Sequence, residues 1–279
     1  MPFPPLRAAA AVVAFLCFLP LLASGQTLNV TNDVRKFATL PDTVATLSGK
    51  AELHVSNAGD PIAGSVIHLN SPDAWFFLTN IAPSRVVSTF LGRVRVNGAA
   101  AMTDTNVRVV QYEMGSVVIP HAPSFSPMEV FDGKAFTGPS KQLRLYTYYN
   151  DTSLGGLQRA VSSFKLKRGY MATVAQQPNG SGASKVYIAQ DGDLEVGALP
   201  TTLDNNIRFV RIFPWRWVGK KGWAGSDGHN MRPLWWYDWG SGPNSSLDTE
   251  YVPMRHNEWW DAYPNSKTNV THVLGYNEP

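Results

Sequence analysis

The chain has 279 residues and a formal net charge of +3, and only 16% of its residues are charged. This length is enough for two or three domains, and the scattered basic residues do not indicate a nucleic-acid-binding protein. Aromatic residues make up 11% of the chain, and eight of its nine tryptophans lie between Trp215 and Trp260. This asymmetry predicts a separate C-terminal unit.

Residues 1–25 are typical of a secretory signal peptide. Arg7 supplies the positive charge, Ala8 to Leu22 form an apolar run, and Ala23-Ser24-Gly25 offers small residues for cleavage. The alternative is a membrane anchor, for which this run is short. We therefore expect a secreted, periplasmic or cell-surface protein without a membrane span after cleavage. The only cysteine, Cys17, lies in this segment, so the exported chain would have no cysteine nucleophile and no thiolate metal site.

Residues 26–125 alternate between strand-length apolar segments and turn residues, which predicts a β-sandwich-like domain. Ser84–Leu91 is the one helix candidate, and Asn97-Gly98 is a turn signal. His54 and His68 fall within strand segments, where structural histidines are expected and metal ligands are the alternative. The strand candidates are 51–55, 66–69, 75–78, 107–112 and 117–119.

Residues 127–213 contain an internal repeat with an offset of 44 residues. In each copy a strand-length segment is followed by a glycine and, two residues later, by a serine. This spacing suits a folded hairpin in which the glycine adopts a positive φ and the serine closes the loop. The two copies are Met128–Phe131 with Gly138 and Ser140, and Ala172–Ala175 with Gly182 and Ser184. The later halves, 162–166 and 208–212, also correspond.

This repeat resembles a βγ-crystallin domain, which implies two Greek-key units. Calcium-binding members carry two Asn or Asp residues, two spacers and then Ser/Thr-Ser, and here 158–163 and 204–209 each keep half of that pattern. The resemblance implies that acidic residues of one copy pair with the serine of the other. Asp204, Asn205 and Ser162 are therefore the candidates for one weak calcium site, with a purely structural role as the alternative. No other cofactor is expected.

From about residue 215 the composition changes. Strand-length apolar segments are found at 235–239, 251–254 and 272–276, separated by residues that favour turns. The last segment leads into Asn277-Glu278-Pro279. Because a parallel α/β barrel places its chemistry at the carboxyl ends of its strands, Glu278 is a candidate general acid.

Three ordered motifs, WWYDWG, EYVPMRH and HVLGYNEP, resemble the alkali-sensitive-linkage type of glycoside hydrolase, a clan A (β/α)8 family acting on β-1,3-glucan. The resemblance implies that 221–225 is the first barrel strand and 272–276 the fourth. It also implies that Glu278 is the acid/base residue at the end of that fourth strand and that Asn277 contacts the sugar 2-hydroxyl. Two departures leave the substrate open. Asp238 stands where the family often has Asn, and Arg255-His256 replaces Leu-Trp.

Residues 215–279 are thus expected to form the first half of an α/β (β/α)8 barrel, with 257–263 as the best helix candidate. A full barrel needs about 250 residues, so a truncated chain is expected, and a protein that ends in a half barrel is the alternative. A retaining glycosidase also needs a second carboxylate, the nucleophile, which is expected beyond Pro279. Asp238 and Glu250 are the substitutes within the chain, and Glu250 is the more structural of the two by position.

Substrate-binding residues are expected among the aromatic and polar side chains at this strand edge. Trp239 ends its strand and is a candidate sugar platform, with core packing as the equal alternative. Trp259 and His256 follow the third strand and are candidates to line the cleft, and Asp238 could face a sugar hydroxyl.

Two functions of different class follow from these patterns. The first is an exported glycoside hydrolase that cleaves β-linked glucan by a retaining mechanism, carrying two N-terminal β-domains. The alternative is a non-catalytic carbohydrate-binding or structural surface protein. In both cases the expected partner is a polysaccharide.

Overall fold

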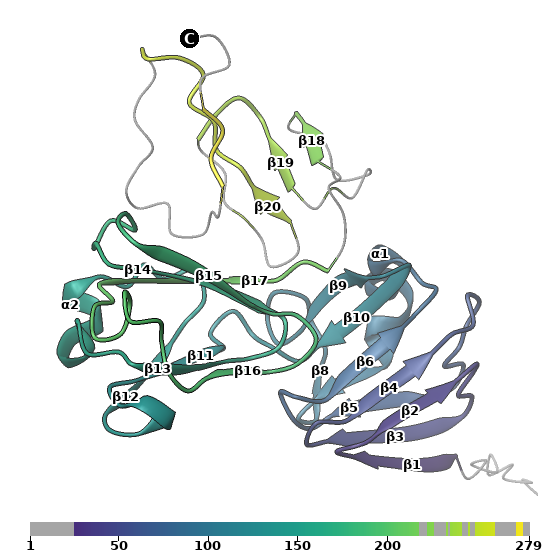
Figure 1. Ribbon diagram of the computed structural model, residues 1–279. Coiled ribbons are helices and arrows are strands. Elements are labelled where there is room, and N and C mark those ends of the chain that lie inside the picture. Colours follow the sequence, from purple (N-terminus) through teal and green to yellow (C-terminus); the bar gives the residue numbers. More distant parts are fainter. Residues whose placement is uncertain are drawn as a thin grey trace, which may run out of the picture.

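A computed structural model describes residues 25–217, 222–225, 233, 235–241, 245, 249–259 and 272–275. Within these residues the protein is mainly β-structure, arranged as a first unit, a middle module and a C-terminal segment (Figure 1). The predicted signal peptide lies outside the described residues, apart from Gly25. No helix in the described part of the chain is long and apolar enough to cross a membrane.

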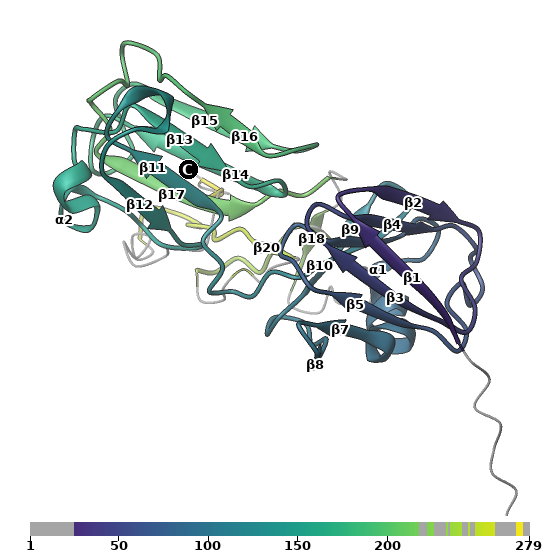
Figure 2. The same ribbon diagram turned by 90° about the horizontal axis from the view of Figure 1, so that it is seen from below.

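The first unit consists of two sheets between which the chain passes repeatedly. Its strands are β1 (Gln26–Thr31), β2 (Val34–Phe37), β3 (Thr43–Ser48), β4 (Glu52–Val55), β5 (Val66–Leu69), β6 (Trp75–Leu78), β7 (Val94–Val96), β8 (Ala99–Ala100), β9 (Arg108–Tyr112) and β10 (Gly115–Ile119). One sheet has the order β1–β3–β5–β7–β8, and the other has the order β2–β4–β6–β10–β9. Figure 2 shows β1, β3, β5 and β7 side by side.

Pairing within these sheets is mostly parallel, because each strand pairs with the strand two places later in the chain. Successive passes therefore stack as rungs of a coil, and side chains such as Leu53 and Phe76 fill the space between the sheets. The predicted β-sandwich has the correct two-layer character but the wrong connections. The reason lies in the corners: Asn32 and Gly49 both have positive φ and turn the chain into the opposite sheet, and Asn32 Oδ1 accepts the N–H of Lys50 at 2.8 Å.

A short helical segment and a hairpin complete the first unit. Helix α1 (Pro83–Arg85) continues as a π-turn over Val86–Phe90, which confirms the helix predicted at 84–91. The predicted turn at Asn97-Gly98 is also present, with φ values of 48° and 84° between β7 and β8. The hairpin β9–β10 closes the second sheet by pairing antiparallel with β6.

The middle module contains the two predicted repeat copies. Its strands are β11 (Met128–Phe131), β12 (Ser140–Leu143), β13 (Ser163–Leu166), β14 (Tyr170–Ala175), β15 (Ser184–Ala189), β16 (Leu194–Val196) and β17 (Phe209–Pro214), with helix α2 (Asp151–Leu154) between β12 and β13. One sheet has the order β12–β11–β13–β16, and the other has the order β15–β14–β17.

The two copies exchange their third segments. β16 of the second copy pairs with β13 of the first, and Tyr149 of the first copy bridges to Val210 of the second. The module therefore contains the two repeat units that the resemblance implied, and the exchange of segments between them is an additional finding. Gly138 and Gly182 have φ of 76° and 79°, as predicted. The role predicted for Ser140 is wrong, however, because its hydroxyl donates to Glu129 Oε1 at 2.8 Å instead of closing the loop.

The first unit and the middle module are joined by charged and aromatic contacts. The Arg168 guanidinium donates to the Glu52 carboxylate and lies 3.6 Å from the centroid of the Trp75 ring. Lys167 Nζ lies 3.0 Å from Asp73 Oδ2. These contacts fix the middle module against the second sheet of the first unit.

The C-terminal segment contains β18 (Gly222–Ala224), β19 (Trp235–Tyr237) and β20 (Glu250–Tyr251), which pair in parallel and in chain order. A parallel bridge between Met254 and Leu274 extends the order by one segment. The described residues after Trp217 include no helix, and the described part of the predicted helix, 257–259, forms a bend and a turn.

Candidate functional site

The candidate site lies where β19 and β20 end. Because the strands are parallel, their carboxyl ends share one edge of the sheet. Asp238 and Trp239 directly follow β19, and the backbone N–H of Met254 reaches the carbonyl of Gly240 at 2.7 Å. Leu274 in turn donates its N–H to the carbonyl of Pro253 at 2.9 Å. These bonds bring three of the predicted motifs to one edge.

Asp238 is held by the neighbouring strand. Its Oδ1 accepts the hydroxyl of Tyr251 at 2.7 Å and the N–H of Gly240 at 3.2 Å. The carboxylate therefore links β19 to β20, and an asparagine could accept the same two bonds through its side-chain oxygen. A carboxylate held in this way is available for a sugar hydroxyl mainly through its other oxygen.

Two predicted aromatic residues present exposed surface. Trp239 is 42% exposed and Trp259 is 85% exposed. Trp239 has a φ of 60°, and its ring packs edge-on against Tyr237 at 5.2 Å. Half-exposed tryptophan rings offer the flat apolar surface that the faces of sugar rings contact.

Of the other predicted site residues, the structure describes His256 but not Asn277 or Glu278. His256 is partly buried and lies two residues after the Met254 bridge. Glu278 and Asn277, the predicted acid/base residue and its partner, lie outside the described residues, a few positions after the described Leu274.

Glu250 has the structural role that its position predicted. Its side chain is buried, at 7% exposure. Its Oε1 accepts the backbone N–H of His272 at 3.1 Å and also lies 3.0 Å from His272 Nδ1. Arg216 Nη1 lies 3.9 Å from its second oxygen. Glu250 thus connects Arg216, before the C-terminal segment, to His272 in the described segment 272–275.

The three predicted calcium ligands meet in the middle module. Ser162 Oγ donates to Asn205 Oδ1 at 3.2 Å, and Asp204 lies beside them. However, Lys134 Nζ lies 3.0 Å from Asp204 Oδ2. The Ser162 hydroxyl and this ammonium together hold the pKa of Asp204 below its usual range.

The position in the second copy that corresponds to Ser162 is occupied by a cationic side chain. Arg208 stands in the place of Ser162, and its guanidinium pairs with Asp151, so that the pKa of Asp151 is lowered. Calcium takes about six to eight oxygen ligands. At each position the carboxylate already has a side-chain cation as its partner, which a calcium ion would have to displace. The described residues also contain no cluster of three or more His, Cys, Asp or Glu side chains suited to a metal ion.

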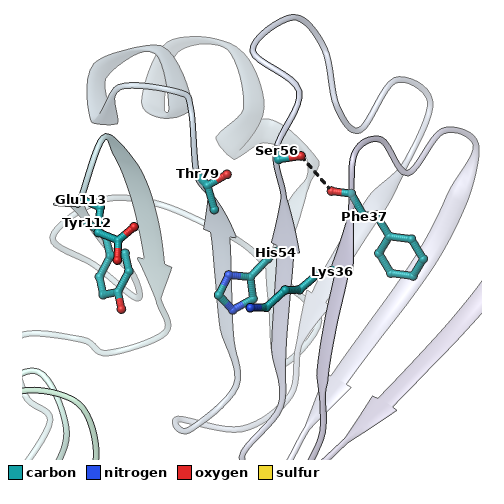
Figure 3. A pocket seen from close by; sticks show the side chains of 7 residues that line it. All are labelled: Lys36, Phe37, His54, Ser56, Thr79, Tyr112 and Glu113. Atoms are coloured by element: carbon teal, nitrogen blue, oxygen red, sulfur yellow. Dashed lines mark hydrogen bonds between the residues drawn. The ribbon is translucent and has the colours of Figure 1, made fainter.

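A separate pocket of about 450 Å³ lies on the first unit. It is lined by residues of β2, residues in or just after β4, the residue after β6, and the β9–β10 hairpin: Lys36, Phe37, His54, Ser56, Thr79, Tyr112 and Glu113. Figure 3 shows Lys36 and His54 next to each other, with Tyr112 and Glu113 on the neighbouring hairpin. No sequence pattern predicts this pocket, because its residues lie on four separate segments.

Known proteins resemble two parts of this chain. A family profile described as "Glycosyl hydrolase catalytic core" matches residues 217–279. Solved structures similar to the chain include a βγ-crystallin domain from Flavobacterium johnsoniae, which is 27% identical, with 32% of this chain and 94% of that chain covered and a TM-score of 0.28. They also include the N-terminal domain of Protein S, at 23% identity, 32% and 97% coverage and a TM-score of 0.28.

No curated protein sequence matches the chain. These solved structures each cover about a third of the chain. At the coarse level that the profile supports, residues 217–279 are similar to a glycosyl hydrolase catalytic core.

Proposed function

We propose that this protein is an exported glycoside hydrolase that cleaves β-linked glucan, with β-1,3-glucan as the first substrate to test. The observation that carries the proposal is the glycosyl hydrolase match over residues 217–279, which includes all three motifs quoted above. The signal-like residues 1–25 support export. Secreted, periplasmic and cell-surface locations all agree with them.

The strand order in the C-terminal segment supports a barrel of the (β/α)8 kind. In such a barrel consecutive strands are parallel neighbours, and β18, β19, β20 and the Leu274 bridge follow that order. We place the active site at the shared carboxyl edge. Asp238, Trp239, His256 and Trp259 are the proposed substrate-binding residues there.

Glu278 is proposed to act first as a general acid and then as a general base. In a retaining mechanism one carboxyl group protonates the leaving glycosidic oxygen while a second carboxylate, about 5–5.5 Å away, attacks the anomeric carbon. Water then hydrolyses the glycosyl-enzyme, and the first carboxylate takes the proton from that water. Asn277 would bind the sugar 2-hydroxyl. The nucleophile is expected near the seventh strand of the barrel.

The test is hydrolysis of β-1,3-glucan by the longest natural form of the protein. We expect reducing ends to be released with retention at the anomeric carbon, and we expect Glu278→Gln to remove most of the activity. Full activity of Glu278→Gln would assign the acid to another residue. Binding of glucan without any hydrolysis by the natural protein would favour the second candidate, a non-catalytic carbohydrate-binding surface protein.

A further inference from the structure

The pocket on the first unit has a fixed imidazole at its centre. The His54 ring stacks on Phe77 with centroids 4.1 Å apart and planes 5° apart. His54 Nε2 lies 2.9 Å from Glu52 Oε2, and the other oxygen of Glu52 receives Arg168 of the middle module. The hydrogen bond from His54, together with Arg168, lowers the pKa of Glu52 to about 2 although burial opposes the shift.

This geometry determines which nitrogen of His54 is free for a ligand. Because Glu52 is ionised above pH 5, it accepts a hydrogen bond and His54 Nε2 carries the proton. In the neutral ring Nδ1 is then a hydrogen-bond acceptor. The stacking on Phe77 and the chain of bonds to Arg168 hold the ring in one orientation before any ligand binds.

The charged groups of the pocket are balanced. Lys36 lies on β2 and Glu113 lies in the β9–β10 turn, and both line the pocket (Figure 3). The hydroxyls of Ser56, Thr79 and Tyr112 complete the lining. A ligand with a net charge would be attracted by one of these groups and repelled by the other, whereas a polyhydroxyl ligand could accept from the ammonium and donate to the carboxylate.

The wall of the pocket is continuous with the C-terminal segment. The Tyr112 ring packs on Phe77 at 5.1 Å and on Trp217 at 5.5 Å, and residue 217 is the first residue of the glycosyl hydrolase match. The volume of about 450 Å³ is within the ~300–1,000 Å³ typical of small-molecule sites.

We propose that this pocket binds a unit of an uncharged saccharide chain, as an accessory site separate from the catalytic edge. The ammonium of Lys36 and the imidazole Nδ1 of His54 contact hydroxyls on one side, and Glu113 accepts hydroxyls on the other. Tyr112 offers a partly exposed ring beside them. The choice of a glucan as the saccharide depends on the proposed function, but the charge balance of the site does not.

The experiment is isothermal titration of the full chain with three hexasaccharides: neutral β-1,3-linked glucohexaose, acidic oligogalacturonate and cationic chitosan hexamer. The titration uses the Glu278→Gln background, so that binding is measured without turnover. We expect the neutral hexamer to bind and the charged ones to bind at least about tenfold more weakly, a difference of ~1.4 kcal/mol.

Variants then assign the binding to the pocket. His54→Phe keeps the ring stack but removes Nδ1, and Glu113→Gln removes the acceptor charge; each should weaken the neutral hexamer about tenfold. Tyr112→Phe, which keeps the packing on Phe77 and Trp217, tests the hydroxyl without unfolding risk. Met114→Ala is the matched control, since Met114 is 85% exposed in the same turn and does not line the pocket.

Trp239→Ala separates this site from the catalytic edge. Binding that survives Trp239→Ala but is lost in His54→Phe belongs to the pocket, whether or not the protein hydrolyses glucan. Binding that is lost in Trp239→Ala and unchanged in the pocket variants would overturn the proposal. So would binding of only the charged hexamers, or no binding of any of the three.

Discussion

The Nδ1 atom of His121 lies 2.5 Å from the hydroxyl of Tyr170, so that a residue from the end of the first unit is bonded to the first residue of β14. His121 Nε2 lies 2.7 Å from the carbonyl oxygen of Pro72. A carbonyl can only accept, so Nε2 carries the proton and Nδ1 accepts from Tyr170. Burial, with the nearby Arg108 charge, lowers the pKa of His121 to about 3.

This buried histidine predicts a pH dependence of stability. Its pKa is about 6.5 in the unfolded chain and about 3 in the folded one, so the unfolded state binds the proton first as the pH falls. Stability should be complete above pH 6.5 and should decrease below it, with a limiting slope of ~1.4 kcal/mol per pH unit from this group. Urea unfolding at pH 7, 6 and 5 measures the slope.

The variant His121→Phe should flatten that slope between pH 6.5 and 5. It should also lower the free energy of unfolding at pH 7 by about 1–3 kcal/mol for each buried group left without a hydrogen bond. These groups are the Tyr170 hydroxyl and the Pro72 carbonyl. His68→Gln is the control, because His68 lies in the same unit on β5 and is only partly buried. An unchanged slope in His121→Phe would show that another group causes the acid sensitivity.

The ion pair between Glu52 and Arg168 should couple the first unit to the middle module. Both side chains are 19% exposed, and a double-mutant cycle with Glu52→Gln and Arg168→Met should give a coupling energy of about 1.5–3 kcal/mol. Arg35→Met is the control, because the Arg35–Asp33 pair is 56% and 50% exposed and should contribute about 0–1 kcal/mol.

The same pair has its own pH window. The hydrogen bond from His54 and, after it, Arg168 lower the pKa of Glu52 from 4.5 to about 2 against the effect of burial, so the contribution of the ionised carboxylate is present above pH 4.5 and is lost as the pH falls toward 2. The coupling energy should therefore be equal at pH 7 and pH 5 and smaller at pH 3. A coupling energy near zero at pH 7 would mean that the Lys167–Asp73 pair, the His121–Tyr170 hydrogen bond and the aromatic contacts hold the two units together without this pair.

The middle module should be indifferent to calcium. Lys134 and Arg208 already neutralise Asp204 and Asp151, so we expect millimolar calcium to leave the melting temperature unchanged. Lys134→Ala should create measurable calcium affinity at the Asp204 position, because it removes the competing charge. Lys185→Ala, a cation elsewhere in the module that lies over Tyr187, is the control. Tight calcium binding by the wild-type protein would contradict this prediction.

The proposed role of Glu278 predicts a dependence on the leaving group. General acid catalysis contributes about 10²–10⁴ in rate, so Glu278→Gln should lose about that factor on β-1,3-glucan. The loss should be much smaller on aryl glycosides, whose leaving groups need no proton. Glu258→Gln, an exposed acid in the same segment, should keep wild-type activity on both substrates. An equal loss on both substrates would indicate a role in binding or folding instead of proton donation.

The sequence predicted which side chains are buried better than it predicted strand pairing. The alternation of Glu52, Leu53, His54 and Val55 correctly indicates that Leu53 and Val55 face the core. The same alternation occurs in a hairpin and in a coil, so it could not distinguish antiparallel neighbours from stacked rungs. Asn32 and Gly49 turn the chain from one sheet into the other and so produce the coil instead of a hairpin. In the sequence they resemble ordinary turn residues.

The candidate sites were predictable only where their residues are close in sequence. The motif around Asp204 and Asn205 identified a real meeting point with Ser162, but Lys134 comes from a different segment and no spacing pattern includes it. His54 was interpreted as an ordinary structural histidine, and its place in a pocket depends on Tyr112 and Glu113 of a distant hairpin. Such juxtapositions arise from the order of strands in the sheet.

The exchange of third segments in the middle module means that the peptide link between its two copies is not what holds them together. β16 is hydrogen-bonded to β13 of the other copy, and Tyr149 is bonded to Val210 in both directions. A protease cut between Arg168 and Gly169 would therefore leave a nicked but assembled module. Each copy produced alone would lack a neighbour for part of its sheet, and the two would be obliged to fold together.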